Sequence, residues 1–306
     1  MTQEILQEDL ERIAKLRLID DDFMSKCFED NIECTELVIQ IVLGRDDLKV
    51  EQVRTQHQIK NLQGRSITLD IYAVDKDGKK YNIEIQRADI GASPERARFH
   101  SSILDSNGLK ASQGYKELVE TYVIFITETD VLKGNLPIYH IDRVIEETGQ
   151  KFGDGSHIIY VNGECQDDTP LGILMQDFFC TDPDQMHYPQ LAERTKYFKK
   201  EKEGVATMSS ILEDMRREVA ERVERETTER VTREVTREVT ERVARETTER
   251  VARETTERVA RETTKNNARE TASKLLRSLG LSYEQVADCV NLSLSEVKEL
   301  AKTLGV

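Results

Sequence analysis

The sequence of 306 residues has no long apolar run, no excess of basic residues and no closely spaced pair of cysteines. Its longest purely apolar run, residues 122–126, is far shorter than the ~20 residues that a membrane-spanning helix requires. The five cysteines are an odd number without CxxC spacing, which indicates reduced thiols and not a disulfide framework or a structural zinc site. Because the first ten residues are also acidic and unlike a signal peptide, the sequence predicts a cytoplasmic protein with no membrane contact.

The charges are numerous and unevenly distributed. The chain has 44 Lys and Arg against 58 Asp and Glu, a net charge of −14, and 33% of its residues are charged. Residues 221–264 hold twelve Glu and eleven Arg, so this segment is nearly neutral and the first 220 residues carry the acidic excess. An acidic domain does not attract nucleic acid through its overall field. If the chain binds DNA, a local basic patch or a bound metal ion must provide the attraction.

Three regions follow from composition and pattern: a globular part at residues 1–200, a long repetitive helix at 201–266 and a small helical unit at 267–306. The globular part has a helical pattern at 36–44 that stops at Gly44, and strand patterns at 66–75, 80–86 and 120–127. Ser93 and Pro94 have the order of an N-cap and a first helical residue. This alternation predicts an α/β fold in which helices flank a mixed sheet.

The long helix is built from eight-residue units such as ERVARETT at 241–248. Valines recur every fourth residue, and four residues advance about 400° on an α-helix, so the apolar stripe turns around the axis. No straight seam results. We therefore favour a solvated spacer, with an oligomerising coiled coil as the alternative that would make the protein a homodimer or a higher oligomer.

The C-terminal unit has the pattern of three short helices. The first, at 268–279, stops at Gly280, and the other two begin at Ser282 and Ser293, each followed three residues later by Gln or Glu as in a capping box. The order resembles a helix-turn-helix unit. The candidate recognition helix, residues 294–303, has no net charge. Two interpretations therefore stay open: DNA contact, and a small packing or partner module.

The strongest chemical signal lies in a predicted hairpin. The sequence Asp75-Lys-Asp-Gly78 suits a tight turn with a three-residue loop and Gly78 in the left-handed conformation. In this register Asp70 and Glu84 lie opposite one another on the same face, and Gln86 points the same way.

Two carboxylates in this position repel each other, and a cation between them removes the repulsion. A hard ion such as Mg²⁺ accepts one or two carboxylates together with water and phosphate oxygens, an arrangement that suits hydrolysis of a phosphodiester. The alternative is a solvated polar face on an antiparallel hairpin.

The motif Leu69-Asp70, a thirteen-residue gap and Glu84-Ile-Gln86 resembles the PD-(D/E)XK nuclease motif in the form found in the recombination-promoting nuclease and putative transposase family. Segments at 22–28, 96–100 and 114–118, and the Glu/Arg helix with its terminal unit, also resemble that family. Leu69 replaces the Pro of the motif, and Gln86 replaces the final Lys.

The resemblance implies a restriction-endonuclease-like core and a metal-dependent DNA endonuclease linked to recombination or mobile elements. It assigns Asp70 and Glu84 as ligands of Mg²⁺, for which Mn²⁺ is a substitute, and gives Gln86 the task of assisting the attacking water. A neutral amide only orients water by hydrogen bonds, whereas a Lys also stabilises charge. The alternative function is therefore an inactive nuclease fold that binds DNA or protein, or oligomerises, through its C-terminal helices.

Three further residues are candidates for the site. Glu36 on the first predicted helix is a candidate ligand or water holder, with a solvated helix position as the alternative. Arg96 and Arg98 are candidates for holding DNA phosphates, although one of them has an acidic neighbour as an equally good partner. The five histidines show no metal-binding spacing and are interpreted as structural or surface residues.

Overall fold

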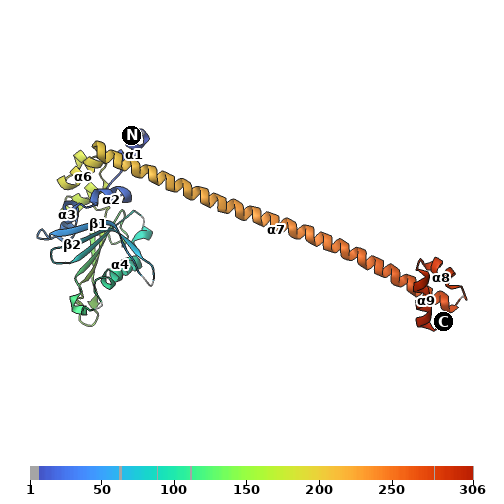
Figure 1. The fold of residues 1–306 in the computed structure, drawn as a ribbon. Coiled ribbons are helices and arrows are strands. Elements are labelled where there is room, and N and C mark those ends of the chain that lie inside the picture. The colour runs from blue at the N-terminus through green and yellow to red at the C-terminus, as the bar shows by residue number, and fades with distance from the viewer. Residues whose placement is uncertain (1–6, 62–63, 88, 111, 279, 306) are drawn as a thin grey trace. The chain divides into compact units, whose positions relative to one another are not determined.

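The computed structural model describes residues 7–61, 64–87, 89–110, 112–278 and 280–305 (Figure 1). The chain divides into two compact units, Met1–Arg217 and Glu218–Val306. No helix in the described part of the chain is both long enough and apolar enough to cross a membrane.

The first unit is built on one mixed sheet of six strands in the order β1-β2-β3-β4-β8-β5. The first three strands form an antiparallel meander, β4 and β8 run parallel to β3, and β5 closes one edge in the antiparallel sense. A separate two-stranded ribbon joins β5 to β8 along the chain. The bounds are β1 Val50–Ile59, β2 Ile67–Asp75, β3 Lys80–Gln86, β4 Thr121–Thr127, β5 Ile138–Ile141, β6 Val144–Ile145, β7 Gln150–Lys151 and β8 Ser156–Asn162.

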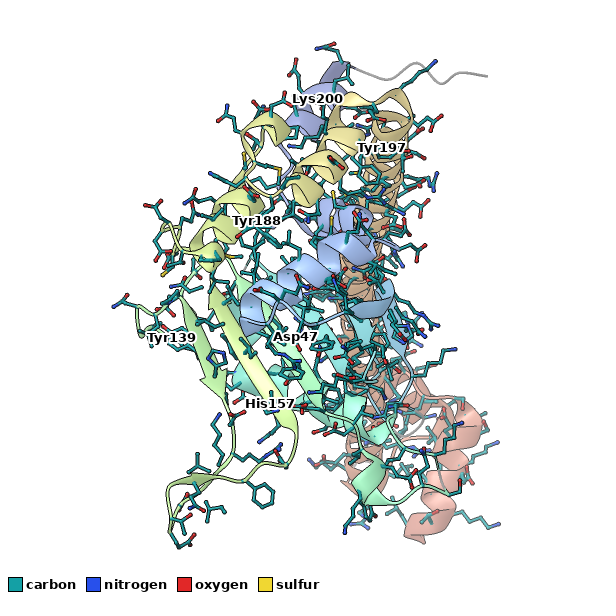
Figure 2. The ribbon with its side chains drawn as sticks, turned by 90° about the vertical axis from the view of Figure 1, so that its left-hand side faces the viewer. Asp47, Tyr139, His157, Tyr188, Tyr197 and Lys200 are labelled. Carbon is teal, nitrogen blue, oxygen red and sulfur yellow. The ribbon has the colours of Figure 1, made fainter. Side chains whose placement is uncertain are left out.

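Helices cover the sheet on both faces, as Figure 1 shows for α2, α3 and α6 on one side and α4 on the other. The larger core lies under the first group, while α4 packs over a second core that includes Val123 and Phe125. In Figure 2, Tyr139 and His157 mark the β5–β8 edge of the sheet. The helices of this unit are α1 Gln7–Lys15, α2 Asp21–Phe28, α3 Ile32–Leu43, α4 Pro94–Ser106, α5 Pro170–Phe179 and α6 Pro189–Lys200, with 3₁₀ turns at Asp89–Ala92, Tyr115–Glu117 and Pro183–Gln185.

Local sequence signals set several of these boundaries. Gly44 ends α3 with a φ of 63°, as predicted, because only glycine enters the left-handed region without a steric cost. The Ser93 hydroxyl accepts a hydrogen bond from Arg96 N, and Pro94 occupies the first turn of α4, which confirms the predicted N-cap.

The predicted register of the β2–β3 hairpin is also confirmed. Ile71 pairs with Ile83 and Ala73 pairs with Tyr81. Gly78 has a φ of 80°, the positive value that the three-residue loop demands. Since side chains alternate along each strand, this register places residues 70, 84 and 86 on the face that α4 covers.

Helix α7, Lys202–Ser278, begins where the long helix was predicted to begin and extends twelve residues beyond its predicted end at residue 266. Its first turns belong to the N-terminal core, where Val205, Met208 and Leu212 are buried. Beyond Arg217 its valines are about half exposed, and i,i+4 ion pairs form at Arg237–Glu241 and Arg253–Glu257.

The C-terminal cluster consists of the end of α7 with α8, Tyr283–Val290, and α9, Leu294–Leu304. Both predicted capping boxes form, at Ser282 with Gln285 and at Ser293 with Glu296. The predicted first helix of this unit is the last part of α7 and not a separate element, and its final residue, Leu279, lies outside the described residues.

Candidate active site

Asp70 and Glu84 meet where the β2–β3 ladder ends. The last backbone pair of the hairpin is Ile71 with Ile83, and beyond it each carboxylate binds the backbone of the opposite strand. Asp70 Oδ2 accepts a hydrogen bond from Ile85 N at 3.0 Å, and Glu84 Oε1 lies 3.4 Å from Asp70 N. The two side chains therefore replace carbonyl partners of the ladder and are held in fixed positions by rigid strands.

Burial makes this pair electrostatically costly. Asp70 is 8% exposed and Glu84 is fully buried. Loss of hydration, and then the charge of Glu84, raise the pKa of Asp70 above that of an ordinary carboxyl group. The site consequently holds more negative charge than its surroundings neutralise, which is the condition under which a carboxylate pair takes up a proton or a cation.

Arg96 supplies one positive charge to this site. Its Nη2 lies 2.8 Å from Glu84 Oε2, and its Nη1 donates to Gly91 O at 2.9 Å. Arg96 and Arg98 were both candidates for holding phosphates, and the sequence allowed one of them to pair with an acidic neighbour instead. Arg96 is the one that does so.

His100, which sequence analysis treated as a structural or surface residue, lies at the site. Arg96 Nε lies 3.4 Å from His100 Nε2, and Asn82 Nδ2 lies 3.2 Å from His100 Nδ1. Nδ1 in turn lies 3.4 Å from Glu84 Oε1. The histidine spacing along the chain gave no signal of this contact, because α4 brings His100 to β3 only through packing.

Gln86 joins the same network at the end of β3. Its Oε1 accepts a hydrogen bond from Arg96 Nη1 at 3.3 Å. Gly91 leaves space for this amide, since a Cβ at Gly91 would lie 1.8 Å from Gln86 Oε1. The hydrogen bond to Arg96 therefore fixes the orientation of the Gln86 amide group, including its nitrogen.

Glu36 is not brought to this cluster. It accepts hydrogen bonds from Lys49 Nζ at 2.7 Å and from Val50 N at 2.9 Å, where β1 begins. Val50 pairs with Asp75, which is five residues from Asp70 along β2. Asp75 is therefore about 17 Å from Asp70 along the strand. The prediction that Glu36 adds a ligand to this site is wrong, because α3 packs over the far end of the hairpin.

A different acidic residue lies closer. Asp21, at the start of α2, interacts electrostatically with both Asp70 and Glu84, and its own pKa is raised by loss of hydration, by Asp22 and by Glu84. The acidic run at 20–22 was the available sequence signal, but nothing in it indicated which strand the helix would face.

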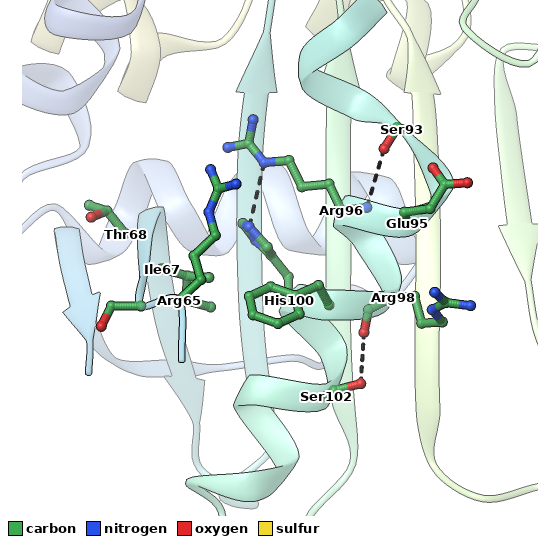
Figure 3. A pocket seen from close by; sticks show the side chains of 11 residues that line it. Arg65, Ile67, Thr68, Ser93, Glu95, Arg96, Arg98, His100 and Ser102 are labelled. Atoms are coloured by element: carbon green, nitrogen blue, oxygen red, sulfur yellow. Dashed lines mark hydrogen bonds between the residues drawn. The ribbon is translucent and has the colours of Figure 1, made fainter. Parts of the chain in front are cut away.

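A cavity of about 920 Å³ opens between the β1–β2 hairpin and the N-terminal half of α4, and Arg96 and His100, which contact Glu84, form part of its wall. Its lining includes Arg65, Arg96, Arg98 and His100 (Figure 3). In Figure 3 Arg96 and His100 are joined by their hydrogen bond, whereas Arg98 points away from His100 on the other side of the helix. The acidic N-terminal unit therefore has a local basic patch, one of the two conditions for attracting DNA, and Arg65 is a member of it that sequence analysis missed.

Comparison with known families agrees with this geometry. Residues 39–165 match the model of the PD-(D/E)XK nuclease family transposases. The predicted resemblance is confirmed over this part of the chain, which contains Asp70, Glu84 and Gln86, and the mixed sheet flanked by helices is consistent with the restriction-endonuclease-like fold. The family indicates a nuclease. No curated protein and no solved structure matches the chain.

The donor set fits a hard divalent cation. Within the described ranges no donor hydrogen bonds to Asp70 Oδ1, and no three or more His, Cys, Asp or Glu side chains form a metal-binding group by themselves. Two carboxylates with water and phosphate oxygens are the usual surroundings of Mg²⁺, which rarely has an all-protein cage. Asp70 and Glu84 are the residues that could hold such an ion, with the remaining ligands coming from solvent and substrate.

Proposed function

We propose that the protein is a Mg²⁺-dependent DNA endonuclease that hydrolyses phosphodiester bonds, with Mn²⁺ as a substitute ion, and that it acts in the cytoplasm in recombination or the movement of mobile elements. The single observation that carries this proposal is the buried Asp70–Glu84 pair within the family match, whose Glu84 contacts Arg96 and His100 in the wall of the basic cavity. The bound ion would supply an activated water and polarise the phosphate.

The protein side chains have distinct tasks in this proposal. Asp70 and Glu84 hold the ion, and Ile85 N and Arg96 fix their orientation. The Gln86 amide nitrogen positions water by a hydrogen bond, since its oxygen already binds Arg96. Arg65 and Arg98 at the rim of the cavity attract the phosphate backbone, a contact that weakens with salt.

Plasmid cleavage by purified protein tests the proposal. We expect the wild type to nick DNA with Mg²⁺ or Mn²⁺ and not with EDTA, and Asp70→Ala and Glu84→Ala to lose at least 100-fold in rate, an order-of-magnitude expectation for the loss of a metal ligand. The matched control is Glu36→Ala, which removes a carboxylate outside the site and should leave the rate within about twofold.

Two outcomes would contradict the proposal. Undiminished cleavage by both site variants would remove Asp70 and Glu84 from the chemistry. A folded wild-type protein that cuts no DNA with any divalent ion would favour the alternative, an inactive nuclease fold that acts through α7 and the C-terminal cluster. Gln86, in the place of a Lys and bound to Arg96, is the observation that keeps this alternative in view.

A further inference from the structure

A second cavity, of about 410 Å³, lies between the end of β1 and the C-terminal end of α4. Two aromatic rings form one wall: His57 of β1 and Tyr72 of β2 stack with their centroids 5.0 Å apart and an angle of 27° between planes. Both side chains are only half-buried. A stacked pair of rings at an open cavity is a surface on which a flat aromatic ligand can lie.

The other feature of this cavity is an unpaired cation. Lys80, the first residue of β3, lines it and is partly buried. Within the described part of the chain Lys80 forms no ion pair, whereas its neighbour Lys79 pairs with Glu120. Loss of hydration lowers the pKa of Lys80, and the negative charge of Asp105 opposes this effect. Lys60 adds a second, exposed cation to the same rim. An ammonium group that is partly withdrawn from water and forms no ion pair favours an anionic ligand.

The cavity continues the face that carries the candidate active site. Tyr72 follows Asp70 by two residues on β2, so both side chains point the same way at a separation of about 7 Å. The first cavity lies along the N-terminal half of α4 and this one at its C-terminal end. A strand held at Asp70 and Glu84 therefore reaches the stacked rings within a short length of its backbone.

From this geometry we infer that His57 and Tyr72 bind an unpaired nucleobase and that Lys80 binds the adjoining phosphate, so that the protein acts on DNA with single-stranded character next to the cleaved bond. The inference rests on the proposed function for its substrate. Base stacking on aromatic side chains with cations along the backbone is the usual mode for single strands, whereas a paired base in a duplex has both faces covered by its neighbours.

The chain has no tryptophan, so a single substitution provides a specific probe. In full-length His57→Trp with EDTA, which prevents cleavage, a single-stranded oligothymidylate should quench the indole fluorescence in a saturable way. An oligonucleotide of the same length with abasic sites should bind roughly tenfold more weakly or worse, because it cannot stack. The matched control is Phe152→Trp, whose ring is 61% exposed beside the β6–β7 ribbon, and its fluorescence should not change.

A second pair of variants tests the phosphate contact. Lys80→Gln should weaken binding of the oligothymidylate by roughly tenfold and reduce its dependence on salt, whereas Lys15→Gln, an exposed lysine on α1, should leave both unchanged. Equal quenching by abasic and base-bearing strands, or tighter binding of a fully paired duplex at His57→Trp, would overturn the inference.

The inference and the proposed function fail in different ways. If the wild type cuts DNA but no oligonucleotide quenches His57→Trp, the nucleobase site is wrong and the endonuclease stands. If quenching occurs as expected and no divalent ion supports cleavage, the nucleobase site stands and the endonuclease is wrong.

Discussion

Glu84 has the most demanding surroundings of any single residue in the site. It is fully buried, and Arg96 at 2.8 Å compensates its charge on one side, while His100 Nδ1 lies 3.4 Å from it on the other. Removing one partner of a buried ion pair is far more costly than removing both, because the remaining charge has neither water nor a counter-charge.

Arg96→Met should therefore reduce the free energy of unfolding by about 3 kcal/mol in the absence of divalent ions. Saturating Mg²⁺ should restore a large part of this loss, since a cation at Glu84 replaces the guanidinium. Urea unfolding with EDTA and with Mg²⁺ measures both effects. Arg98→Met, an exposed neighbour on the same helix, serves as the control and should change stability by less than about 0.5 kcal/mol.

A substitution of Asp70 should have the opposite effect and raise the free energy of unfolding. Because its folded pKa is raised, the folded protein binds a proton more tightly than the unfolded chain, so stability falls as the pH rises above the ordinary carboxyl pKa. Without metal, Asp70→Asn should be more stable than the wild type at pH 8 by on the order of 2 kcal/mol, and this advantage should disappear near pH 4. Thermal unfolding at both pH values with EDTA measures the difference; a variant that is less stable at pH 8 would contradict it.

The sequence was sufficient for some residues of the site and not for others. Asp70, Glu84 and Gln86 followed from the turn at Gly78, which fixes the register, and from the alternation of side chains along two adjacent strands. Arg96, His100 and Asp21 reach the same point from helices, and a helix pattern states which face is apolar but not which strand it covers. Glu36 was misplaced for this reason.

At the scale of elements, the contact between α1 and the first turns of α7 shows how segments about 200 residues apart are joined. Asp9 is nearly fully buried and accepts hydrogen bonds from Ser209 Oγ at 3.0 Å and from Arg216 Nη2 at 3.2 Å. The Arg216 guanidinium is the main reason that the pKa of Asp9 lies below its ordinary value, against the effect of burial.

This contact should stabilise the N-terminal unit above the ordinary carboxyl pKa and lose its effect as the pH falls through the lowered folded pKa. Asp9→Asn is expected to reduce stability at pH 7 by about 1–2 kcal/mol, a value discounted because Arg216 is partly exposed. The difference from the wild type should become smaller as the pH falls toward 2. Unfolding curves at the two pH values measure it, with the exposed neighbour Glu8→Gln as the control; an equal loss at both would show that the charge is unimportant.

The strands predicted from sequence, β2, β3 and β4, all have buried apolar runs. Strand β8 has one as well but was not predicted. Strand β1 was missed because it is a sheet edge whose side chains are mostly polar and exposed, so it has no clean alternation. Strand β5 is a short edge of four residues and carries little pattern of its own. Their positions are determined by pairing with β2 and β8, which is tertiary information.

At the scale of the whole chain, the structure bears on where the N-terminal unit can be cut. The core includes Val205, Met208 and Leu212, all beyond the boundary at residue 200 that composition suggested. These three residues begin a highly charged helix, so composition groups them with the helix and not with the core. The sequence does not show at which residue this helix leaves the core and enters solvent.

A fragment of residues 1–217 should therefore unfold cooperatively with nearly the stability of the same unit in the full chain, whereas a fragment of residues 1–200 should lose several kcal/mol. Each of the three removed side chains contributes about 2 kcal/mol or more of burial. Thermal unfolding of both fragments beside the full chain tests this expectation. Equal stability of the two fragments would place the boundary at residue 200 after all.

The repetitive part of α7 is made of eight-residue units whose side chains face solvent on every side. The gain or loss of one unit changes the gene by a whole number of codons and the length of the helix by about 12 Å. Neither change removes a buried contact. Translation then continues in the same reading frame into the C-terminal cluster. Replication slippage at this locus would thus yield intact proteins that differ only in helix length, and a population of cells can carry many such lengths without losing either folded unit.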